Sequence, residues 1–107
     1  MKFIITESKL NSIIFDYLDN QDFVKIENSD YIFFINSEGD EFAKIKYDKY
    51  DSWCYIYYGL IDEISTFFSF DYNNSKELIG NWVENTLEME VDGIQPITLG
   101  YLSVKDI

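Results

Sequence analysis

The chain has 107 residues, of which 47% are hydrophobic and 19% aromatic, so it can bury one core and is not an intrinsically disordered protein. Twenty Asp and Glu face eight lysines, with no Arg and no His, which gives a formal net charge of −12. A surface this negative repels nucleic acid and anionic membranes, and its natural complement is a basic patch on another protein.

A first helix is predicted after Thr6, which can act as the N-cap, while Ile5 and Leu10 can pack together as a hydrophobic staple. The apolar positions then recur with helical spacing, and they are Leu10, Ile13, Ile14, Tyr17 and Leu18. The polar run 19–22 should end this helix.

A meander of three or four antiparallel strands is expected next, from the segments 23–26, 31–35, 42–47 and 53–58. The second is apolar throughout, which indicates a strand that is covered on both faces or lies centrally. The third alternates, so that Ala43, Ile45 and Tyr47 should share one dry face.

Two further helices are expected after the strands. Residues 60–68 return to helical spacing, and Asn74 can cap a last helix, with Glu77 as the return half of a capping box. The apolar face of this helix consists of Leu78, Ile79, Trp82, Val83, Thr86 and Leu87. Residues 97–104 could add an edge strand after Pro96. The order α-β-β-β-β-α-α-(β) predicts one α+β domain over residues 1–107, with about three helices packed on an antiparallel sheet of three to five strands.

Catalysis is not expected, because a chain without His lacks the commonest general base and the usual Ser–His and Cys–His pairs. A carboxylate pair could hydrolyse glycosides, but nothing marks two acidic residues as buried partners. Zinc would find one Cys and no His, and the loops 36–41 and 48–51 lack the acidic spacing of an EF-hand. We therefore predict no catalytic residues, no metal and no cofactor.

The single cysteine, Cys54, excludes an internal disulfide and favours a reducing compartment. Its place in the strand 53–58 is typical of a buried structural thiol. The apolar run 3–5 is too short for a signal peptide, and no stretch approaches the ~20 apolar residues of a membrane span. We expect a cytoplasmic protein.

The last predicted helix carries a row of carboxylates. On a helical wheel Glu77, Glu84 and Glu88 fall within about 40° of one another, with axial separations of about 10 Å and about 6 Å. This spacing is comparable to that of phosphates along a DNA strand, and Glu90 and Asp92 continue the acidic path. The row could imitate a nucleic-acid backbone in a basic groove, or it could be an ordinary solvated face.

A second candidate contact surface is aromatic. Alternation places Tyr55 and Tyr57 on the same side of the strand 53–58 as Trp53. They form either a partly exposed aromatic ladder or a Tyr-rich patch, bordered by acids, that binds protein. Stacking on single-stranded bases is disfavoured by the sign of the charge.

Three segments carry a resemblance: the start Met1–Leu10, the run Asp51–Tyr58 and the run Ser75–Leu87. Together they resemble small uncharacterised proteins encoded by bacteriophages, which implies a phage product that works in the host bacterial cytoplasm. In size and charge alone the chain is similar to inhibitors of host defence nucleases, including anti-CRISPR proteins, some of which imitate DNA.

These features favour a non-enzymatic inhibitor that binds a basic, nucleic-acid-handling host or defence protein and does not contact nucleic acid or membrane. The expected partner-binding residues are Glu77, Glu84, Glu88, Glu90, Asp92, Asp62, Glu63, Tyr55 and Tyr57. The alternatives are an immunity-type protein that neutralises a cognate toxin and a virion or assembly accessory protein, for which a homodimer is possible.

Overall fold

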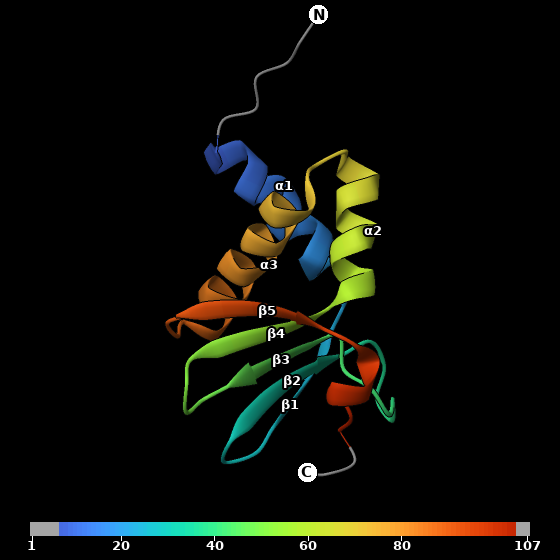
Figure 1. Cartoon of the computed structure of the whole chain (residues 1–107), viewed down its shortest axis with the longest axis vertical. Coiled ribbons are helices and arrows are strands. Elements are labelled where there is room, and N and C mark those ends of the chain that lie inside the picture. Colours follow the sequence, from blue (N-terminus) through green and yellow to red (C-terminus); the bar gives the residue numbers. More distant parts are fainter. Residues whose placement is uncertain (1–6, 105–107) are drawn as a thin grey trace, which may run out of the picture.

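The computed structural model describes residues 7–104, apart from the side chains of Glu7, Ser8 and Leu10. The elements in chain order are α1 (Glu7–Asp19), β1 (Val24–Glu27), β2 (Tyr31–Ile35), β3 (Ile45–Asp48), β4 (Trp53–Tyr57), α2 (Tyr58–Phe68), α3 (Tyr72–Leu87), β5 (Gly93–Ile97) and the 3₁₀ turn η1 (Leu99–Tyr101). This order confirms the predicted α+β class, and Figure 1 shows the three helices gathered on one side of the strands.

The five strands form one sheet in the order β1-β2-β3-β4-β5. The first four pair antiparallel, as expected for consecutive strands that are joined without a crossover helix. β5 pairs parallel to β4, because α2 and α3 carry the chain across before it returns.

The expected last strand at 97–104 was placed too late, since β5 begins at Gly93 and ends at Ile97. Pro96 lies within β5 and not before it, because at the outer edge of a sheet its missing N–H costs little. Beyond β5 the chain forms η1 and a single antiparallel bridge between Ser103 and Phe42.

The main core lies between the sheet and the helices. From the sheet it contains Ile32, Phe34, Ile45, Tyr47, Cys54 and Ile56, and from the helices Ile14, Leu18, Ile61, Ile64, Ile79 and Val83. Burying each aliphatic side chain of this size stabilises the fold by about 1.5–3 kcal/mol relative to leaving it in water. Side chains alternate along β3 and β4, and those that point toward the helices are buried: Ile45, Tyr47, Cys54 and Ile56.

A smaller core lies on the other face of the sheet, where Phe33, Ile35, Ala43 and Leu102 are buried together. It confirms that β2 is covered on both faces. Ala43 was expected on the same face as Ile45, but β3 begins only at Ile45, so the chain ahead of it does not follow the alternation. The segment after β5 supplies Leu102 to this face.

The starts of α2 and α3 differ from expectation. α2 begins at Tyr58 directly after β4, so Tyr58 belongs to the helix and not to the strand. The N-cap of α3 is Asp71, whose carboxylate accepts a 2.9 Å hydrogen bond from the backbone N–H of Asn74. The predicted Asn74 cap is therefore wrong, because Asp71 is an equally good cap and extends the helix by one turn. The Thr6 cap and the Ile5–Leu10 staple lie outside the described residues.

Close contact between α3 and β5 depends on one glycine. A Cβ atom at Gly80 would lie 2.3 Å from Cδ1 of Ile94, so the absence of a side chain lets the helix pack directly on the strand. This contact sets the Gly80 side of α3 against Ile94, next to the start of β5.

Candidate partner-binding surface

The negative charge is unevenly distributed between the two layers. Residues 58–92, which form α2, α3 and the loop before β5, contain eight acidic residues and one lysine, Lys76. Residues 23–57, which form β1 to β4, contain seven acidic residues and four lysines. The helix layer from α2 onward is thus the more negative part of the molecule.

Two of the predicted glutamates lie on one side of α3. Glu77 and Glu84 are seven residues apart, which is nearly two helical turns, and both are exposed. The buried residues of this helix are Ser75, Leu78, Ile79, Gly80, Trp82 and Val83. Trp82 also donates an indole hydrogen bond of 3.0 Å to Asp19 at the end of α1, which fixes the rotation of α3.

Glu88 does not continue the helical row. The helix ends at Leu87, and Glu88 adopts a left-handed conformation with φ 54° and ψ 38°. A left-handed residue at this position reverses the chain direction at a helix end. The predicted alignment on one side of the helix therefore holds for Glu77 and Glu84, whereas Glu88 lies in the turn after the helix.

Hydrogen bonds attach the loop after α3 to the rest of the fold. The carboxylate of Glu84 accepts a 3.1 Å hydrogen bond from the N–H of Val91, and the hydroxyl of Tyr47 donates a 2.6 Å bond to the carbonyl of Glu90. The N–H of Asp92 donates a 2.7 Å bond to the carbonyl of Ser52. The loop is thereby fixed to α3, β3 and the turn before β4.

This arrangement brings the first and last predicted acids together. Glu77 and Asp92 line one shallow hollow of about 180 Å³, with Lys76 beside them. Glu84 lies two turns along the same helix, and exposed Glu88 and Glu90 lie on the connecting loop. We call Glu77, Glu84, Glu88, Glu90 and Asp92 the acidic surface.

Asp62 and Glu63 are on a different helix, α2, where both are exposed. Burial raises the pKa of Tyr17 in α1, and the charge of Glu63 and its hydrogen bond with Tyr17 raise this pKa further. Glu63 therefore faces α1. The structure thus places Glu63 between α1 and α2 and not beside the acidic surface.

Tyr55 and Tyr57 are half-buried on the sheet face opposite the main core. The Nζ atom of Lys46 lies 5.2 Å from the ring centre of Tyr55, and that of Lys44 lies 4.8 Å from the ring centre of Tyr57. Each ring therefore contacts a cation of this protein. Burial and then the charges of Asp48 and Asp51 raise the pKa of Tyr55.

The structure therefore separates the predicted residues into three groups: the acidic surface, the α2 pair and the tyrosines. The lysine–tyrosine contacts were missed by sequence reasoning. Alternation around Ile45 and Tyr47 puts Lys46 on the opposite face, but the contacts follow from strand pairing, which sets Lys46 opposite Tyr55 and joins the carbonyl of Lys44 to the N–H of Tyr57.

Other chemistry is sparse in residues 7–104. Within this range no group of three or more His, Cys, Asp or Glu side chains could hold a metal ion. Cys54 is buried, and burial raises the pKa of its thiol to about 12, which makes it unreactive. No helix in the described part of the chain has the length and apolar character needed to cross a membrane.

Comparisons of the chain with protein families, with curated proteins and with solved structures give no match.

Proposed function

We propose that this protein is a non-enzymatic inhibitor whose acidic surface docks in the basic, nucleic-acid-binding groove of another protein. The observation that carries the proposal is the fixed loop after α3, which brings Asp92 beside Glu77 on a segment with a single lysine. In this proposal the partner is a host or defence protein and the inhibitor acts in a bacterial cytoplasm, as the resemblance to phage proteins implies.

Preorganisation supports this function. Glu84 is restrained by Val91, and Glu90 is restrained through its carbonyl by Tyr47. Carboxylates on a fixed backbone lose less conformational entropy on binding than those on a mobile loop. A rigid acidic surface also resembles a nucleic-acid backbone more closely than a flexible one.

Long-range electrostatic attraction to a basic partner also supports the proposed function. A net charge of −12 accelerates encounter with a basic groove, and complementary charge contributes more to association rate and specificity than to affinity. Binding should accordingly weaken as salt screens the charges.

The proposal is tested by affinity capture from bacterial lysate on the immobilised protein, followed by elution with double-stranded DNA. The expected result is a nucleic-acid-binding protein that is released by DNA and is lost when salt rises from about 50 mM to about 500 mM. A captured protein that binds DNA and this chain simultaneously, or equally well at both salt concentrations, would contradict the proposal.

A further inference from the structure

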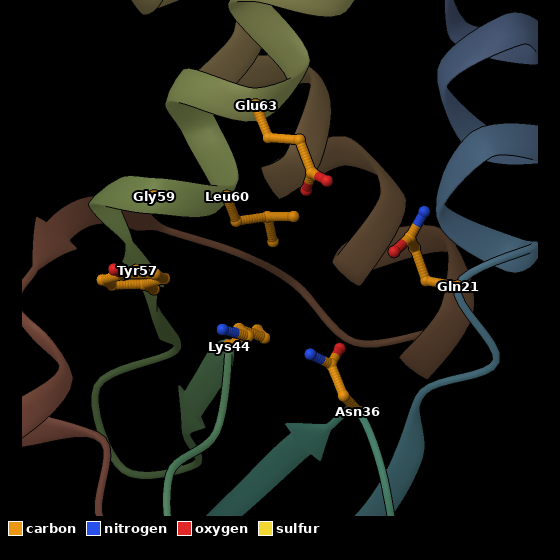
Figure 2. Close-up of a pocket in the computed structure, with 7 residues that line it drawn as sticks. All are labelled: Gln21, Asn36, Lys44, Tyr57, Gly59, Leu60 and Glu63. Carbon is orange, nitrogen blue, oxygen red and sulfur yellow. The ribbon is translucent and has the colours of Figure 1, made fainter.

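A hollow of about 420 Å³ lies where the turn after α1, the end of β2 and the first turn of α2 meet. Figure 2 shows side chains that enter it from these elements: Gln21 from the turn, Asn36 from the end of β2 and Glu63 from α2. Lys44 lies on the sheet side of the same space. Its volume is within the range of about 300–1,000 Å³ that is usual for small-molecule sites.

One side of the hollow offers hydrogen-bond donors. Lys44 contributes an ammonium group, which forms no ion pair with any described carboxylate. Gly59 and Leu60 line the hollow at the start of α2, where the first N–H groups of a helix have no acceptor within the helix. Tyr57, the N-cap of α2, makes no side-chain cap bond. These groups would favour a carboxylate.

The other side offers acceptors. Glu63 contributes a carboxylate, which also accepts a hydrogen bond from Tyr17 and keeps further acceptor positions, and Gln21 contributes an amide oxygen. In Figure 2 both lie on the helix side of the hollow. A positively charged amino group is the natural partner of such a pair. Opposite charges thus line one hollow without neutralising each other.

The region between the two sides is apolar. Figure 2 shows the Leu60 side chain between Glu63 and Lys44. The ring of Tyr57 packs over Gly59, where a Cβ atom would lie 2.3 Å from the ring, so only glycine permits this wall. An aliphatic group could contact both.

From these three parts we infer that the hollow binds an amino-acid-like zwitterion with an aliphatic side chain. Its carboxylate lies near Lys44 and the start of α2, its amino group lies near Glu63, and its side chain contacts Leu60 and Tyr57. This ligand site goes beyond the proposed function and does not include the acidic surface on α3.

The test uses three probes of the same shape in amide NMR titrations. L-leucine carries both charges, 4-methylpentanoate lacks the amino group, and isopentylamine lacks the carboxylate. The expected result is saturable shifts at the amides of Lys44, Gly59 and Leu60 with leucine, and at least about tenfold weaker binding of either single-charge probe. Absence of saturable shifts up to about 50 mM leucine, or equal affinity for all three probes, would overturn the inference.

Two variants assign the charges. Lys44→Met should weaken leucine binding about tenfold and leave isopentylamine binding unchanged, whereas Glu63→Gln should weaken leucine and spare 4-methylpentanoate. The matched controls Lys25→Met and Glu38→Gln change the same charges outside the hollow and should leave leucine affinity unaltered. The inference is overturned if both hollow variants, shown to be folded by their amide spectra, bind leucine as the parent does. Charge reversal on α3 should not alter leucine binding, so failure here and failure of the proposed function are distinguishable.

Discussion

The hydroxyl of Tyr47 and the carbonyl of Glu90 are joined by a 2.6 Å hydrogen bond, which ties the loop after α3 to β3, the central strand of the sheet. Tyr47 is almost fully buried, so its ring is held by the main core. The packing of Tyr47 in the core therefore determines where the loop after α3 lies.

Replacing Tyr47 with Phe removes this bond and keeps the ring. We expect the free energy of unfolding to fall by about 1–2 kcal/mol, because the Glu90 carbonyl loses its partner. Urea denaturation measures the change, and amide shifts confined to residues 88–92 would show that the loop has moved. An unchanged midpoint with unchanged loop shifts would show that the bond does not hold the loop.

Cys54 should be inert in the folded protein. Its thiol pKa of about 12, compared with about 8.5 for a free thiol, lowers the thiolate fraction near pH 8 by roughly a thousandfold. Modification by an aromatic disulfide reagent should therefore be at least about 100-fold slower in the native state than in denaturant. Rapid stoichiometric labelling of the native protein would contradict the buried position.

The pKa of Glu27 depends on one ion pair. The Nζ atom of Lys49 lies 2.6 Å from Oε2 of Glu27, and its hydrogen bond and charge lower the pKa of that carboxyl below its usual range. Lys49→Met should therefore raise the pKa of Glu27, as measured by carboxyl NMR. Lys25 lowers the same pKa through its charge as a lesser cause, so Lys25→Met should produce a smaller rise.

The sign of the accompanying stability change follows from linkage. Because the folded-state pKa of Glu27 is lowered, the pair stabilises the fold above the unfolded-state pKa and loses this effect as pH falls through the folded-state value. Glu27 is exposed at the surface, so the effect on stability should be small compared with the shift in its titration. An identical Glu27 titration in the parent and Lys49→Met would contradict the pair.

Local pattern predicted most of the fold. The apolar run at β2 indicated cover on both faces, and its burial on two sides confirms this. Helical spacing also identified the buried face of α3 around Leu78 and Val83. These features depend on periodicity within one element, which a sequence displays directly.

Features that depend on competition or on tertiary contact were not predictable in this way. Asp71 and Asn74 are both good N-cap residues, and local sequence does not decide between them. The left-handed turn at Glu88 has no glycine to mark it. The approach of Asp92 to Glu77 depends on the loop hydrogen bonds, which join residues far apart in the chain.

Whether the acidic surface binds the partner can be measured by reversing two of its charges and comparing affinities for the captured protein. Glu77→Lys with Asp92→Lys changes the acidic surface and leaves the Glu84–Val91 bond intact. The matched control, Asp30→Lys with Glu38→Lys, makes the same change in net charge at exposed positions of the strand segment. We expect at least about 100-fold weaker binding for the first variant and less than about threefold weaker binding for the control. Equal weakening by the two double variants, or unchanged binding of Glu77→Lys with Asp92→Lys, would rule out the acidic surface as the binding site.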